Sequence, residues 1–189
     1  MGQYYKPCLL ATDYKTSENP IIGALNCYAY HAGGKLMEHS YVGTTFTKAA
    51  CAMLKGNKDK PFVWGGDYGD PINRGENAYS LGRIDDFDVK YGEEHIGKYD
   101  DVKKMPIDKY IINHTTKEYV VVPKLKRDED FVIHPLPILT CDGNGRGGGD
   151  LYNSTDEEFI GIWAYNVIES ANKVPSGYKK LDVHFVETY

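Results

Sequence analysis

Short apolar stretches separated by polar turns run along most of the chain and predict a series of β-strands. These stretches are residues 4–12, 21–30, 61–64, 110–113, 118–122 and 132–140. The two stretches at 110–113 and 118–122 flank a short polar segment and predict a hairpin. Pro135 and Pro137 remove two amide donors from the same side of the 132–140 stretch, so we expect that strand at a sheet edge or with a bulge.

The C-terminal part of the chain predicts two more strands. Residues 159–168 alternate with a period of two and are apolar on both faces, which is typical of a buried central strand. After a turn at residues 175–177, Leu181, Val183 and Phe185 predict a last strand. We expect the last three strands of the chain to form an antiparallel meander.

One segment has the pattern of an amphipathic helix. Its apolar positions, at the spacing i, i+3, i+4, i+7 and i+8, are Phe46, Ala49, Ala50, Met53 and Leu54. Thr44 or Thr45 can cap its N-terminus, and Gly56 is a typical residue at the C-terminal end. The pattern is weaker elsewhere: residues 77–84 favour a strand, and the charge-rich residues 85–104 fit a short helix or a long loop.

These elements predict one folded unit. The 189 residues suffice for one sizeable core, and the chain shows neither an internal repeat nor a linker. We therefore predict a single α+β domain over residues 1–189, mainly an antiparallel β-sheet with one clear helix packed on it. The four cysteines form no CxxC pair, so we expect reduced, mostly buried thiols, no metal and no other cofactor.

Composition narrows the range of partners. A net charge of −5 argues against broad binding of nucleic acid. No apolar run reaches the length of a membrane span and no secretory signal is visible, so we expect a cytoplasmic protein with no membrane partner. Sixteen tyrosines against six phenylalanines are typical of half-buried strands and binding surfaces. The sequence does not determine the oligomeric state.

The most unusual segment is the glycine run, residues 143–150, in which five of the first seven residues are glycine. It contains G-x-G-x-x-G, but a strand is predicted to follow it where a dinucleotide-binding fold needs a helix. A P-loop is excluded because no Gly-Lys-Ser/Thr ends the run. A calcium loop is disfavoured because Arg146 and Asn153 stand where ligands belong.

Two interpretations of the glycine run remain. It is either a connection in which glycine supplies positive φ angles, or a nest of backbone amides that binds a phosphate or carboxylate. We favour the nest, because Arg146 can add a bidentate fork for the anion and Asp150 can hold a ribose hydroxyl or orient that arginine. The predicted ligand-binding residues are Gly143, Asn144, Gly145, Arg146, Gly147, Gly148 and Asp150, with Trp64 and Tyr68 as stacking partners for a base.

A second set of residues suggests acid–base chemistry. His39 lies just before the predicted helix and can be a general acid or base, or a structural histidine. Asp67 and Asp70 follow the 61–64 strand in a glycine-rich segment, and can serve as catalytic or metal-binding partners or as turn-forming residues. We take His39, Asp67 and Asp70 as the candidate catalytic residues and assign no metal site.

Six motifs follow one another over nearly the whole chain: Met1-Gly-Gln-Tyr-Tyr-Lys, Lys35-Leu-Met-Glu-His-Ser, Val63-Trp-Gly-Gly-Asp-Tyr-Gly-Asp, Asn113-His-Thr, Pro135-Leu-Pro-Ile-Leu-Thr and Gly143-Asn-Gly-Arg-Gly-Gly-Gly-Asp. In this order they resemble a family of uncharacterised bacterial and phage proteins. The resemblance implies a small cytoplasmic protein of bacteria or their viruses, and it implies no activity.

The sequence therefore favours a protein that binds an anionic, nucleotide-like small molecule through the glycine run, as in capture of a nucleotide signal in phage–bacteria conflict. One alternative is a hydrolase acting on a nucleotide or related phosphate, with His39 as acid–base and Asp67 or Asp70 as its partner. The other is a protein–protein inhibitor that uses a tyrosine-rich face. Consumption of the ligand separates the enzyme from the binder, and recovery of a protein partner identifies the inhibitor.

Overall fold

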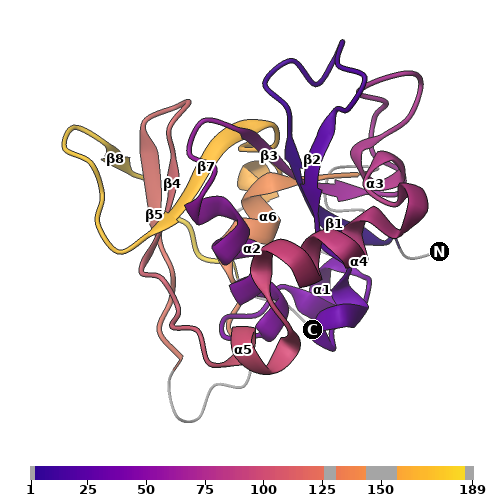
Figure 1. Ribbon diagram of the computed structural model, residues 1–189. Coiled ribbons are helices and arrows are strands. Elements are labelled where there is room, and N and C mark those ends of the chain that lie inside the picture. The colour runs from indigo at the N-terminus through magenta and orange to yellow at the C-terminus, as the bar shows by residue number, and fades with distance from the viewer. Residues whose placement is uncertain (1–2, 126–130, 144–156, 186–189) are drawn as a thin grey trace.

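A mixed β-sheet forms the framework of the protein, whose computed structural model describes residues 3–125, 131–143 and 157–185 (Figure 1). Its strands are β1 (Tyr5–Leu10), β2 (Ile21–Ala24), β3 (Pro61–Gly66), β4 (Tyr110–Asn113), β5 (Glu118–Val121), β6 (Cys141–Asp142), β7 (Asn166–Ala171) and β8 (Lys179–Lys180). The strand order is β2-β1-β3-β7-β4-β5-β8, and β6 pairs with β3. The β3–β6 and β5–β8 pairs are parallel and the others are antiparallel, so the prediction of a mainly antiparallel sheet holds only in part.

Helical segments are more numerous than the sequence pattern indicates. Within the described ranges the α-helices are α1 (Leu36–His39), α2 (Thr45–Lys55), α3 (Ala78–Leu81), α4 (Phe87–Tyr91), α5 (Tyr99–Lys103) and α6 (Pro135–Thr140). The α+β class is confirmed, but the expectation of one helix is wrong. Five of the six helices are no longer than six residues, too short to show a helical period in sequence.

Helix α2 is the one predicted helix, and the structure confirms it. The hydroxyl of Thr44 accepts a hydrogen bond from the amide of Thr47 at 3.2 Å, and Gly56 follows the last helical residue. Its apolar face joins a buried cluster with sheet residues such as Phe62 and Ile168. The amphipathic pattern and both end signals therefore agree with the packing.

The predicted strand at 132–140 is wrong: most of it is helix α6. Pro135 occupies the first turn of that helix, where a missing amide costs nothing because no carbonyl of the helix would accept it. The ring of His134 caps this end, since its Nδ1 accepts a hydrogen bond from the amide of Leu136 at 3.2 Å. Proline here marks the start of a helix, not the edge of a sheet.

The predicted central strand at 159–168 is also wrong over most of its length. Gly161 and Tyr165 have φ angles of 69° and 66°, and the amide of Ala164 bonds to the carbonyl of Gly161 at 3.1 Å, so the segment turns. Strand β7 starts only at Asn166. It runs between β3 and β4, while β8 pairs with β5, so the expected meander does not form.

Residues 71–108, for which the sequence left alternatives open, contain three short helices. The side chain of Asn77 caps α3 by accepting from the amide of Ser80 at 2.9 Å, so the predicted strand at 77–84 is wrong. Helix α4 continues into one π-helical turn, Gly92–Ile96, and α5 follows after Gly97. Residues 85–104 therefore form short helical segments with a break at Gly97 and Lys98.

Two expectations from composition can be compared with the structure. All four cysteines are free and buried, as expected for structural thiols. In the part of the chain that the structure describes, every helix is too short or too polar to cross a membrane.

Candidate functional site

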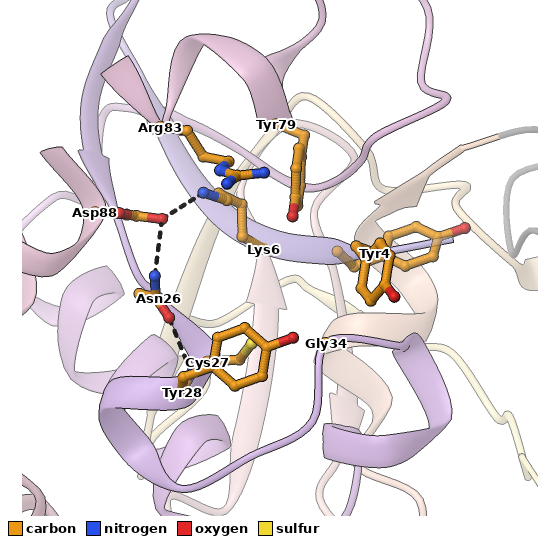
Figure 2. Close-up of a pocket in the computed structure, with 10 residues that line it drawn as sticks. Tyr4, Lys6, Asn26, Cys27, Tyr28, Gly34, Tyr79, Arg83 and Asp88 are labelled. Atoms are coloured by element: carbon orange, nitrogen blue, oxygen red, sulfur yellow. Dashed lines mark hydrogen bonds and ion pairs between the residues drawn. The ribbon is translucent and has the colours of Figure 1, made fainter. Parts of the chain in front are cut away.

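A pocket of about 260 Å³ opens where the start of β1 meets the segment after β2 and helices α3 and α4 (Figure 2). Its lining residues come from four segments of the chain: Tyr4, Tyr5, Lys6, Asn26, Cys27, Tyr28, Gly34, Tyr79, Arg83 and Asp88. The residues that bear charge are two cations and one carboxylate, so the lining carries net positive charge. The volume lies just below the range of roughly 300–1,000 Å³ that is usual for small-molecule sites.

The floor of the pocket is a buried ion pair. The ammonium of Lys6, on β1, bonds to the carboxylate of Asp88, on α4, and each side chain is only 4% exposed. Asp88 also accepts from the amide of Val89 at 2.9 Å and from the side-chain amide of Asn26 at 3.5 Å. The pair satisfies the rule that a buried charge needs a partner, and it fixes both side chains at the floor.

Helix α3 supplies one wall of the pocket. Asn77 caps this helix and also bonds to the carbonyl of Asp67 at 2.9 Å, which ties α3 to the end of β3. The ring of Tyr79, on α3, lies 4.6 Å from the Lys6 ammonium and 5.5 Å from the Arg83 guanidinium. Burial raises the pKa of the Tyr79 hydroxyl, and the nearby Arg83 partly offsets this, so the hydroxyl stays protonated at neutral pH.

The guanidinium of Arg83 is exposed at the rim of the pocket. Within the described ranges it forms no ion pair, and its one cation–π contact is with Tyr79. Arg83 and Lys6 both make a cation–π contact with the Tyr79 ring, but the charge of Lys6 is already balanced by Asp88. An exposed guanidinium without a counterion is well suited to an anion.

Two tyrosine rings form the outer walls of the pocket. Tyr4 is 44% exposed and Tyr28 is 65% exposed, so both present aromatic surface to solvent. Tyr4 is held through its backbone, because its amide donates to the carboxylate of Asp67 at 3.1 Å. Tyr28 is held in the same way by Asn26, whose side-chain oxygen accepts from the Tyr28 amide at 3.0 Å.

Gly34 allows these two rings to approach the backbone. A Cβ added at Gly34 would lie 2.6 Å from the Tyr4 ring and 3.2 Å from the Tyr28 hydroxyl. We predict that Gly34→Ala displaces the Tyr4 ring into the pocket, so that any compound bound there would bind about tenfold more weakly, while Tm changes little because the exposed ring can move. Calorimetric titration and thermal unfolding measure the two effects.

The matched control for that substitution is Gly56→Ala, whose added Cβ meets nothing within 4 Å. It should leave binding unchanged. Unaltered affinity in Gly34→Ala would show that the Tyr4 ring does not border the bound ligand.

The second glycine-rich segment lies beside this pocket but serves packing. A Cβ on Gly65 would lie 3.0 Å from Ala78, and one on Gly66 would lie 2.9 Å from the carbonyl of Asp142. These glycines therefore let α3 and β6 pack closely against the end of β3. Of the predicted site residues here, Asp67 positions Tyr4, whereas Tyr68 and Asp70 are exposed and outside the pocket lining.

Trp64 and His39, predicted as stacking and catalytic residues, are brought together in the core. Both are fully buried, and the indole Nε1 of Trp64 donates to Nε2 of His39 at 2.9 Å. Because this nitrogen accepts, Nδ1 carries the proton and donates to the carbonyl of Gly33 at 2.8 Å. Both ring nitrogens are thus engaged, and the geometry agrees with the structural alternative for His39.

Of the glycine run, Gly143 is the residue that belongs to the described ranges. Gly143 is half-buried and follows β6, whose last residue, Asp142, pairs with Gly65 near the end of β3 that adjoins the start of β1. The other predicted ligand-binding residues of the run, Asn144, Gly145, Arg146, Gly147, Gly148 and Asp150, lie outside the described residues.

One further pair of reactive side chains, Cys51 and His134, has a structural explanation. Cys51 lies 3.9 Å from Nε2 of His134, but His134 uses Nδ1 as an acceptor, so Nε2 carries a proton and cannot take one from the thiol. Burial raises the pKa of Cys51 to about 12. In the described ranges, no cluster of three or more His, Cys, Asp or Glu residues can hold a metal ion.

Sequence reasoning missed the residues that define the pocket: Lys6, Asn26, Tyr79, Arg83 and Asp88. One signal was present, because Lys6 is a charged residue inside a segment predicted to be a buried strand, and such a lysine needs a partner. Its partner lies 82 residues away, in the part of the chain with the weakest pattern.

Fold and site together define an α+β protein with a small pocket that has aromatic walls and a cationic rim. Comparison with protein-family models, curated proteins and solved structures gives no match. The resemblance to bacterial and phage proteins stays a prediction.

Proposed function

We propose that the protein binds an anionic, nucleotide-like small molecule in the pocket between Tyr4, Tyr28 and Tyr79. The observation that carries the proposal is the exposed Arg83 guanidinium, which has no counterion among the described residues and lies against the half-buried Tyr79 ring, in a pocket that the exposed rings of Tyr4 and Tyr28 also line. Aromatic rings stack on bases of any sequence, and a guanidinium binds phosphate bidentately. The sequence predicts an arginine and stacking aromatic rings for such a ligand at Arg146, Trp64 and Tyr68, whereas the proposal places these features at Arg83, Tyr4, Tyr28 and Tyr79.

The size of the pocket limits the ligand. A volume of about 260 Å³ favours a single nucleotide-sized compound over a dinucleotide. For a ligand of this size, an efficiency of about 0.3 kcal/mol per non-hydrogen atom predicts a Kd on the order of 10 µM. The proposal is a binder, since His39 has no free nitrogen that could transfer a proton to a ligand in the pocket.

Calorimetric titration with the common ribonucleoside 5′-monophosphates tests the proposal. We expect at least one of them to bind, and Arg83→Gln to weaken that binding about tenfold or more because a charge-assisted hydrogen bond is lost. The matched control is Arg74→Gln, which removes another exposed arginine outside the pocket lining and should not change the affinity.

Two results would contradict the proposal. Titrations without heat or thermal stabilisation for any monophosphate would exclude a nucleotide-like ligand. Equal losses in Arg83→Gln and Arg74→Gln would show that binding depends on overall charge and not on this pocket.

A further inference from the structure

The floor of the pocket offers hydrogen bonds without net charge. Lys6 and Asp88 neutralise each other, yet each has unused capacity. Among the described residues the Lys6 ammonium hydrogen-bonds only to Asp88, which leaves two of its three donors. Three donors reach the Asp88 carboxylate, which has about four acceptor positions.

Asn26 adds to this floor without changing its charge. Its oxygen accepts from the amide of Tyr28 and keeps a second lone pair, and its amide group reaches Asp88 with one of two hydrogens. The floor therefore presents both donors and acceptors, close together and uncharged overall. This is the pattern that the edge of a nucleobase complements.

The rim of the pocket is different, because its charge is not balanced. Arg83 is exposed, while Lys6 and Asp88 are each 4% exposed at the floor. An anionic group at the floor would lie against the Asp88 carboxylate and would compete with it for Lys6. The same group at the rim meets a guanidinium with no carboxylate partner in the described part of the chain.

We infer that the ligand enters with its uncharged heterocycle toward the Lys6–Asp88 pair and leaves its anionic group at the rim beside Arg83. This orientation rests on the proposed function and deepens it, since it assigns separate parts of the ligand to separate residues. Figure 2 shows Lys6 and Arg83 close together beside the Tyr79 ring, with Tyr28 on the other side of the pocket near Asn26, so a planar ring between the two tyrosines can reach both ends of the ligand site. The pair acts as a specificity element that accepts a base and rejects a phosphate.

A comparison of nucleosides with their 5′-monophosphates tests the orientation. Adenosine, guanosine and their monophosphates are titrated calorimetrically into the wild type, Arg83→Gln and the double variant Lys6→Met/Asp88→Asn. In the wild type, we expect each monophosphate to bind about tenfold more tightly than its nucleoside. Arg83→Gln should abolish this difference and leave the nucleoside affinity within about twofold. The double variant should weaken both ligands about tenfold and preserve the difference.

The opposite pattern overturns the inference. If the advantage of the monophosphate survives in Arg83→Gln, or disappears in the double variant, the phosphate lies at the floor and the orientation is wrong while the proposed function stands. If no nucleoside or monophosphate binds the wild type, both the orientation and the proposed function are wrong. If the double variant does not fold, the comparison of wild type with Arg83→Gln is sufficient to test the orientation.

Discussion

Lowering the pH from about 7.5 to about 5 is expected to reduce the free energy of unfolding by on the order of 4 kcal/mol. The cause is two buried neutral histidines, His39 and His134. Burial lowers the pKa of each imidazole to about 4, from 6.5 in the unfolded chain. Between these two values the unfolded state binds more protons than the folded state, so stability falls as pH falls through this range. Above pH 6.5 the contribution is constant, and below about pH 4 the loss is complete.

Urea unfolding at a series of pH values measures this loss. His39→Gln keeps an acceptor for Trp64, and His134→Asn keeps an N-cap for α6, yet neither side chain titrates in this range. Each single variant should halve the slope of the unfolding free energy against pH, and the double variant should reduce that slope nearly to zero. His184→Gln, at a side chain that is 82% exposed, is the control and should leave the slope unchanged. An unchanged slope in both core variants would assign the acid sensitivity to other groups.

The sequence predicts those elements whose signals are local. Helix α2 has a cap at Thr44, an apolar face and a terminal glycine, all within thirteen residues of sequence, and it folds as predicted. The sequence does not predict helix α6, for two reasons. Its N-cap is the ring of His134, which is an unusual capping residue, and its two prolines are also typical of a strand at a sheet edge. Only the structure of the backbone shows whether these prolines begin a helix or lie at a sheet edge.

The site depends on contacts that no local pattern contains. Lys6 and Asp88 meet because β1 and α4 pack together, and Arg83 reaches the rim because Asn77 ties α3 to the end of β3. The glycine-rich segment after β3 is also misinterpreted from sequence as part of a ligand site, for a related reason. Gly65 and Gly66 are required by the close packing of α3 and β6, which is a constraint from the fold and not from a ligand.

Removing one partner of the buried ion pair should have the other large effect. Lys6→Met or Asp88→Asn alone is expected to cost about 3–5 kcal/mol of unfolding free energy, because each leaves a buried charge without its partner. The double variant Lys6→Met/Asp88→Asn removes both charges, and its loss should fall well below the sum of the two single losses. The coupling energy from this cycle, measured by chemical denaturation, then gives the interaction free energy between Lys6 and Asp88.

An exposed pair in the same protein provides the comparison. Lys180 and Asp182 lie 3.0 Å apart but are 49% and 73% exposed, so water already solvates both charges. The cycle with Lys180→Met and Asp182→Asn should give a much smaller coupling energy than the cycle of the buried pair. Equal coupling in the two cycles would mean that Lys6 and Asp88 are solvated as well as a surface pair is. Since the inferred orientation places an uncharged base against a buried pair whose charges neutralise each other, that result would weaken the assignment of a base to this position.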